Sequence, residues 1–227
     1  MTTPHLKYMR TCLDLASQAP ALPTNFRVGA LLISRHISDP TPNYTSDQLL
    51  STGYTMQHPG NTHAEQCCLA NFASQHNVSP EHVAEVLPSD PDRKLVMYVT
   101  MEPCGKRLSG NLPCVERIIR TRGEGAGERK GIEKVYFGVK EPGTFVGESM
   151  GVRRLEEAGI EWEVVGGLER EILSVAVAGH EDREGGVEKA MEGVKTDLDG
   201  ISAEERRRQE GVKRNPKKRM MEGEVMV

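Results

Sequence analysis

The chain has 227 residues, a formal net charge of −4 at pH 7 and five cysteines. This length is enough for one well-buried core with an appended segment. The negative charge argues against a general attraction to nucleic acid, and no apolar run approaches the roughly 18 residues of a membrane-spanning helix. An odd number of cysteines, without a cleavable apolar N-terminal stretch, argues against a secreted disulfide framework and predicts a reducing, cytoplasmic compartment.

The first third of the chain predicts a helix, a hairpin and a second helix. Apolar residues recur at three- and four-residue steps over 5–17, which is typical of an amphipathic helix. The apolar run 26–34 predicts a buried strand, and residues 51–57 predict a shorter one. The loop 39–47 between them carries prolines and short polar residues, so the strands are expected to pair as a hairpin. The next helix is predicted over 63–75.

The middle of the chain continues the alternation of strands and helices. Two short apolar runs at 94–100 and 134–139 predict interior strands, with a helix at 115–120 between them. The pattern closes with a helix, a strand and a final helix, at 151–158, 160–165 and 168–178. This alternation predicts an α/β layered domain over residues 1–179.

Residues 180–227 form a charged tail without any strand-like run. Apolar residues from Val187 to Ile201 keep helical spacing, and Ser202 to Glu205 read as a capping box. The tail is therefore predicted to be partly helical and to pack on the domain or on a neighbouring subunit.

Two motifs carry the residues of a metal site. The sequence THAEQ places His63 and Glu65 at the first turn of a predicted helix, where both side chains can face one point beyond the helix end. Cys104 follows a strand in the sequence EPC, and Cys114 opens the next helix in a second PC pair. One imidazole and two thiolates form a three-ligand set for Zn²⁺ that leaves the fourth position open to water.

Other side chains compete for the fourth ligand position. Cys67 lies four residues after His63 on the same helix face, and as a ligand it would turn the site into a structural one. Because free cysteines are often buried, Cys67 and Cys68 are interpreted as core residues. His58 is a weaker candidate, in a predicted loop.

With water on the metal, Glu65 has a chemical task. A carboxylate that is not a ligand can take a proton from the water and pass it to a leaving amine, which predicts hydrolytic deamination. The usual zinc-deaminase motif separates its cysteines by two residues, whereas nine intervene here. The loop 105–113 carries four candidate substrate-binding residues: Lys106, Arg107, Ser109 and Asn111. Arg107 is expected to bind a phosphate, because its planar fork suits one; an ordinary solvated loop is the alternative.

The segments THAEQ, TMEPC, RLSGNLPC and GVKEPGTFV resemble the cytidine-deaminase superfamily. Within it they are similar to the fungal-type pyrimidine deaminases of riboflavin biosynthesis, and NFRVGA and GVRRLEEAGIEW support the similarity over about residues 5–178. The resemblance implies a three-layer α/β/α cytidine-deaminase-like fold with a mixed five-stranded sheet, and a homodimer.

The resemblance also implies the roles of individual residues and a reaction. It makes His63, Cys104 and Cys114 the zinc ligands and Glu65 the proton shuttle, and it places Asn25 beside the pyrimidine. Thr62 joins the candidate substrate-binding residues. The implied reaction replaces the 2-amino group of 2,5-diamino-6-ribitylamino-4(3H)-pyrimidinone 5′-phosphate by oxygen and releases ammonia. The bacterial bifunctional enzymes carry a histidine-rich loop and a reductase domain that have no counterpart here, so reductase activity is not expected.

Two other functions compete with this interpretation. The chain could deaminate cytidine, deoxycytidylate or tRNA, although the wide cysteine spacing argues against these substrates. It could instead bind nucleic acid through the basic segment 213–219, KRNPKKR, with an inert deaminase fold. The presence of His63, Glu65 and both ligand cysteines argues against inertness. The same basic segment would also allow nuclear targeting beside the expected cytoplasmic location.

Overall fold

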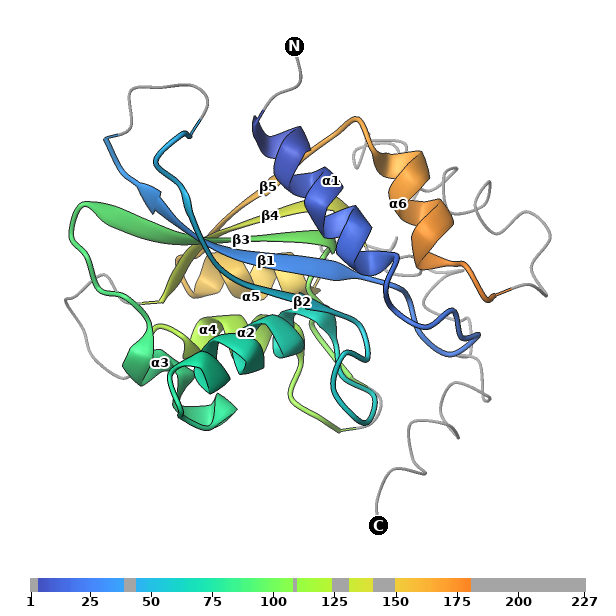
Figure 1. Cartoon of the computed structure of the whole chain (residues 1–227), viewed down its shortest axis with the longest axis horizontal. Helices are drawn as coiled ribbons and strands as arrows, with labels where there is room; N and C mark the ends of the chain where they lie inside the picture. The colour runs from blue at the N-terminus through green and yellow to red at the C-terminus, as the bar shows by residue number, and fades with distance from the viewer. Residues whose placement is uncertain (1–3, 39–43, 108–109, 124–130, 141–149, 181–227) are drawn as a thin grey trace.

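Five strands and their connecting helices form one layered unit (Figure 1). The computed structural model describes residues 4–38, 44–107, 110–123, 131–140 and 150–180. The elements follow in this order: α1 (Pro4–Ala16), β1 (Gly29–His36), β2 (Gln48–Tyr54), α2 (Ala64–Gln75), the 3₁₀ turn η1 (Pro80–His82), α3 (Val83–Val86), β3 (Arg93–Met101), α4 (Cys114–Arg120), β4 (Ile132–Val139), α5 (Met150–Glu157), β5 (Glu161–Val164) and α6 (Glu169–Ala176). Among the described residues, no helix is long and apolar enough to cross a membrane.

The sheet is mixed, with the strand order β2-β1-β3-β4-β5. The hairpin partners β1 and β2 are antiparallel, and β1 is also antiparallel to β3. The pairs β3–β4 and β4–β5 are parallel, as helical crossovers between the strands require. Both the hairpin and the mixed five-stranded sheet confirm the prediction.

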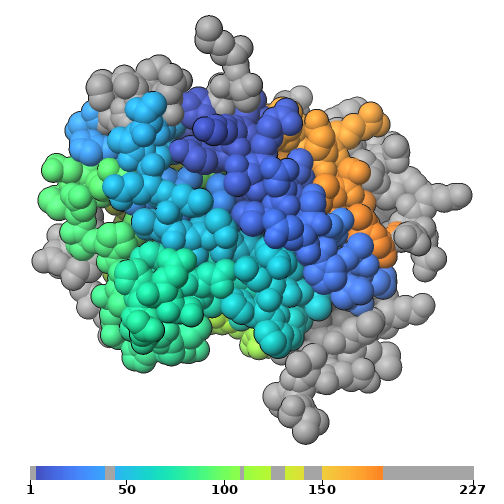
Figure 2. Space-filling model, viewed as in Figure 1, coloured from blue at the N-terminus to red at the C-terminus, as the bar shows by residue number. Residues whose placement is uncertain are grey.

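Side chains alternate between the two faces of the sheet and build two cores. Leu32 and Val99 point to the face covered by α2 to α5, where a large apolar cluster gathers. Leu31 and Val96 point to the opposite face, which α1 and α6 cover. Figures 1 and 2 show α1 lying alongside α6 over the sheet. The three-layer arrangement is therefore present as expected.

The sequence interpretation missed a short helical segment and a buried polar cluster. The segment is η1 with α3, which packs on α2 through Val83 and Leu87. Their four-residue spacing is a helical signal that was too short to stand out. The predicted tail helix, from residue 181 onward, lies outside the described residues, so the domain boundary near 179 stays a prediction.

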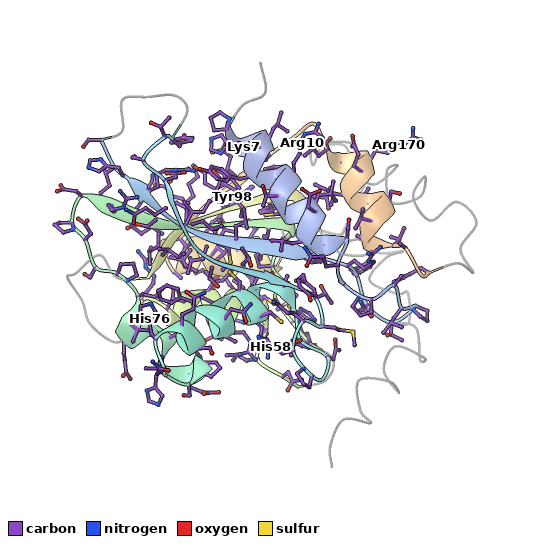
Figure 3. All side chains as sticks on the ribbon, viewed as in Figure 1. Lys7, Arg10, His58, His76, Tyr98 and Arg170 are labelled. Carbon is purple, nitrogen blue, oxygen red and sulfur yellow. The ribbon has the colours of Figure 1, made fainter. Side chains whose placement is uncertain are left out.

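The polar cluster surrounds Arg35 near the end of β1. The Arg35 side chain is 2% exposed and pairs with Asp47 at 2.8 Å, and its Nη2 also donates to the Tyr98 hydroxyl at 2.9 Å. The ring of Tyr44 lies 3.7 Å from the guanidinium carbon, and Tyr8 donates to Asp47 at 2.8 Å. In Figure 3, Tyr98 lies between the sheet and α1. The buried charges of Arg35 and Asp47 are thus paired with each other and hydrogen-bonded to tyrosine hydroxyls, which is typical of a structural ion pair.

Candidate metal and active site

Three elements meet where β3 ends and bring together the residues with metal-binding side chains. His63 is the N-cap of α2, with extended backbone (φ −90°, ψ 160°) and no capping bond from its side chain. Cys104 follows β3, and Cys114 is the first residue of α4. Within the described residues, His63, Cys104 and Cys114 are the group whose ligand atoms could hold a metal ion, all within 4.8 Å of one another. The imidazole is therefore free to face the two sulfurs.

The distances in this cluster fit tetrahedral zinc. The Nδ1 atom of His63 lies 3.6 Å from the Sγ of Cys104 and 3.3 Å from the Sγ of Cys114. Zinc bonds of about 2.3 Å to sulfur and 2.0–2.1 Å to nitrogen at tetrahedral angles imply a nitrogen–sulfur separation of about 3.6 Å. Two sulfurs and one nitrogen are also the donor types that zinc prefers. The distances and the donor atoms of this cluster therefore both fit Zn²⁺, the ion predicted from the sequence.

The surroundings of the two cysteines shift their pKa values in opposite directions. The Cys114 side chain donates to Cys104, whose sulfur also accepts from the Cys114 backbone N–H at 3.4 Å. These hydrogen bonds and the nearby imidazole of His63 lower the pKa of Cys104 to about 4, in spite of its burial. The same bond, together with burial, raises the pKa of Cys114. Cys104 is thus the sulfur of the pair that ionises more readily, next to the place that a cation would occupy.

Glu65 lies on the first turn of α2, directly beside the cluster. Its side chain is 3% exposed and hydrogen-bonds to Cys114. Burial, with the negative sulfur of Cys104, raises the pKa of Glu65 to about 7. A buried carboxyl at this place can hold a proton within reach of the cluster while remaining outside the ligand set.

Close packing of α2 on β2 determines where these residues lie. A Cβ atom on Gly53 would stand 2.3 Å from the backbone nitrogen of Cys68 and 2.5 Å from the carbonyl oxygen of Ala64. The first turns of α2 therefore rest directly on the strand, which only glycine permits. This contact sets the height at which His63 and Glu65 stand above the sheet.

Asn25 lies in the segment that joins α1 to β1, at the same edge of the sheet. The backbone of this segment bonds to the strand ends, with Val28 to Thr55 at 3.0 Å and Gly29 to Thr100 at 3.3 Å. The Asn25 side chain is buried, and neither its Nδ2 nor its Oδ1 has a hydrogen-bond partner. A buried amide without a partner costs free energy, so its presence indicates a place where a ligand can bind.

Residues 2–125 match the model of the cytidine and deoxycytidylate deaminase zinc-binding region. The chain belongs to this deaminase family. The match contains His63, Glu65 and both cysteines of the cluster.

Two relatives place the chain within the deaminase family. The diaminohydroxyphosphoribosylamino-pyrimidine deaminase of Schizosaccharomyces pombe is 31% identical over 176 residues, which are 78% of this chain and 36% of that protein. The chain thus spans about a third of this curated relative. The Rib2 deaminase of Aspergillus oryzae, crystallised as a C-terminal deletion mutant with DARIPP, is 63% identical, with a TM-score of 0.76 and coverage of 85% of this chain and 100% of that one. Its structure at pH 4.6 is 66% identical over 84% of this chain, with a TM-score of 0.76.

The side chains that competed for the fourth ligand position lie apart from the cluster. Cys67 and Cys68 are both fully buried, and Cys68 belongs to the apolar core. The Nε2 of His58 lies 2.8 Å from the Oδ1 of Asn71, a residue of α2 (His58 is labelled in Figure 3). Neither Cys67 nor His58 is part of the group that could hold a metal ion. Among the described residues, this group therefore offers three protein ligands and no fourth.

Arg107 points into the protein. It is 7% exposed; its Nη2 donates to the carbonyl oxygen of Asn61 at 2.6 Å and its Nη1 to Gln66 at 3.3 Å. It thereby ties the loop between the cysteines to the segment before His63, a role that its sequence position gave no sign of. The phosphate contact expected of Arg107 from the sequence thus competes with two hydrogen bonds inside the protein.

The remaining candidate substrate-binding residues are placed as follows. Lys106 and Asn111 are exposed, and Ser109 lies outside the described residues. The Thr62 hydroxyl donates to the carbonyl oxygen of His58 at 3.0 Å, inside its own loop. Lys106 is therefore the loop cation that faces solvent.

Glycines shape the same loop in two different ways. Gly110 has φ +80°, a left-handed conformation with open space around it, as a tight turn requires. At Gly105, an added Cβ would lie 2.7 Å from the nitrogen of Gly151 in α5. One glycine is thus required by conformation and the other by close packing.

Proposed function

We propose that the chain is a zinc-dependent deaminase that converts 2,5-diamino-6-ribitylamino-4(3H)-pyrimidinone 5′-phosphate by replacing its 2-amino group with oxygen and releasing ammonia. The observation that carries the proposal is the cluster of His63, Cys104 and Cys114 with the buried carboxyl of Glu65 beside it. The relative from Aspergillus oryzae binds DARIPP, which supports a pyrimidine ribityl phosphate as the ligand.

His63, Cys104 and Cys114 would hold the ion through Nδ1 and two sulfurs. When bound, zinc lowers the pKa of a water molecule towards about 7 and polarises the reacting centre. The chain supplies three ligands, so one position is left for the reactant.

Glu65 would move the protons of the reaction. It takes a proton from the attacking water and gives it to the ring nitrogen next to the reacting carbon. It then delivers the second proton to the amino group, so that the C–N bond breaks and ammonia leaves as the C=O bond forms. Its burial keeps bulk water from competing for these protons.

Asn25 would orient the ring. A side-chain amide offers donors and an acceptor, which match the alternating donors and acceptors along a pyrimidine edge. Both polar ends of the Asn25 side chain are buried without a partner in the described structure, so a bound ring would satisfy them. This contact favours a pyrimidine over an apolar ring.

Lys106 would bind the phosphate from the solvent side of the loop. Its exposure leaves the ammonium available, whereas the guanidinium of Arg107 is engaged with Asn61 and Gln66. Lys106→Ala should then lower kcat/KM only for the phosphorylated substrate, by the roughly 1.5 to 3 kcal/mol of a hydrogen bond to a charged group. Arg107→Ala should lower it about equally with and without the phosphate. If Arg107→Ala lowered kcat/KM only for the phosphorylated substrate, Arg107 would be the residue that binds the phosphate.

The homodimer implied by the resemblance is also proposed for this chain, as is a cytoplasmic location with access to the nucleus. Light scattering of the full chain tests the first, since a dimer has twice the mass of the 25.1 kDa chain. Fluorescent tagging, with and without residues 213–219, tests the second.

The deciding experiment measures ammonia release. The purified chain is given the ribityl pyrimidine phosphate, its unreduced ribosyl analogue, and cytidine in separate reactions. We expect turnover of the first, and Glu65→Gln should keep its zinc while losing about 10²- to 10⁴-fold in rate. Preferred turnover of cytidine would show that the chain is a nucleoside deaminase instead. A Glu65→Gln variant that keeps more than about a tenth of the rate would exclude Glu65 as the proton shuttle.

A further inference from the structure

The segment that carries Asn25 is held in place by the end of α6. The backbone N–H of Arg27 donates to the carbonyl oxygen of Ala176 at 3.1 Å. Gly179, with φ +93°, lies so close to Ala21 that an added Cβ would stand 2.5 Å from its backbone. Two parts of the chain that are about 150 residues apart in sequence therefore form one packed edge.

His180 forms a hydrogen bond with the backbone of Asn25 itself. Its Nε2 lies 2.9 Å from the backbone oxygen of Asn25. Because that carbonyl can only accept, the histidine nitrogen must carry the hydrogen and donate. The imidazole also stacks on the ring of Phe26, with centroids 5.4 Å apart and planes at 16°. The peptide on the C-terminal side of Asn25 is thus held by a hydrogen bond and a ring stack together.

Asn25 itself offers no side-chain bond that could hold it. Its buried Nδ2 and Oδ1 have no partner, so the direction of the amide follows from the backbone to which it is attached. A group that orients a substrate must be held to within about 0.5 Å and 10–20°. In this structure the backbone contact from His180 supplies such a constraint.

We propose that His180 is a positioning residue for the deamination reaction: it holds the Asn25 peptide so that the side-chain amide of Asn25 faces the substrate ring. The proposal rests on the proposed contact of Asn25 with the pyrimidine. It gives the junction between α6 and the tail a direct connection to the active site. His180 does not touch the reacting atoms and acts only through Asn25.

Two substitutions separate the hydrogen bond from the ring. His180→Gln keeps an N–H donor at nearly the same distance from the backbone, and His180→Phe keeps the ring on Phe26 but removes the donor. The matched control is His76→Phe, because His76 also packs on a phenylalanine, Phe72, with ring centroids 4.5 Å apart. His76 follows the C-terminal end of α2, whereas His63 precedes its N-terminal end (Figure 3). All variants are made in the full chain, and zinc content and melting temperature are measured for each.

The kinetic test follows kcat/KM for the ribityl pyrimidine phosphate. Loss of one hydrogen bond corresponds to about a fivefold decrease in His180→Phe, at unchanged zinc content, while His180→Gln and His76→Phe stay within about twofold. In an Asn25→Ala background, His180→Phe should cause no further loss, because its target is absent. Equal losses in His180→Gln and His180→Phe, or an undiminished loss beside Asn25→Ala, would overturn the proposal.

A second readout does not depend on activity. The side-chain amide of Asn25 gives one pair of ¹H–¹⁵N signals, identified by its disappearance in Asn25→Ala. This pair should shift in His180→Phe and keep its position in His180→Gln and His76→Phe. An unshifted pair in His180→Phe would refute the positioning role even if the chain deaminates the expected substrate. A shifted pair in a chain that deaminates only cytidine would support positioning and reject the proposed substrate.

Discussion

The buried ion pair of Arg35 and Asp47 should be a large contributor to folding and have no part in catalysis. Both side chains are almost fully buried, with 2% and 3% exposed. The carboxylate of Asp47 accepts from Nε and Nη2 of Arg35 and from the hydroxyl of Tyr8. Although burial opposes its charge, the bonds to Asp47 and Tyr98 raise the pKa of Arg35. A guanidinium is too basic to lose its proton in a protein, so the cation persists when Asp47 is removed.

Asp47→Asn therefore leaves a buried cation without a counterion. Breaking one side of such a pair costs about 3 to 5 kcal/mol. For a domain of this size, that loss lowers the melting temperature by roughly 6 to 20 °C. The double variant Arg35→Met, Asp47→Leu removes both charges and should recover most of the loss, because apolar replacements of a buried pair are often neutral.

The catalytic parameters should stay unchanged in the same variants. In the register of the sheet Arg35 lies opposite Lys94 at the start of β3, whereas Cys104 follows the end of that strand. The strand of nine residues separates the two places by about 25 to 30 Å. Urea unfolding gives the free energies, and ammonia release at 20 °C gives kcat/KM per folded molecule. A loss below 1 kcal/mol in Asp47→Asn, or a double variant less stable than either single one, would refute this reasoning.

Three further predictions concern other parts of the chain. Cys114→Ser should lose bound zinc, measured by atomic absorption, because an alcohol is a poorer zinc ligand than a thiolate; full zinc occupancy would exclude Cys114 as a ligand. Gly53→Ala should cost about 1 to 3 kcal/mol in urea unfolding, since its methyl group overlaps the backbone of Cys68; unchanged stability would mean that α2 can move away freely. Burial and the bond to Asp47 raise the pKa of Tyr8 to about 12, so its contribution to stability is complete below pH 10 and is lost as the pH rises towards 12. Tyr8→Phe should flatten that alkaline loss in pH-dependent melting, and an identical profile would contradict the assignment.

The sequence by itself determined the fold class and the chemistry of the site. Alternating apolar runs with two periodicities were enough to place the sheet strands and the longer helices, because burial imposes those periods directly on the sequence. The cluster of His63, Cys104 and Cys114, which could hold a metal ion, was predicted from motifs, since zinc accepts few side-chain types and each motif marks the end of a strand or the start of a helix.

Contacts between distant segments were decided only by the tertiary structure. The stretch around Arg107 shows two cations in a polar loop, and nothing in it indicates that one of them turns inward to the carbonyl of Asn61. No sequence pattern indicates the pairing of Arg35 with Asp47 or the bond from His180 to Asn25 either. A hydrogen bond or ion pair across the fold leaves no periodic pattern, because it depends on where two backbones are brought by the packing of everything between them.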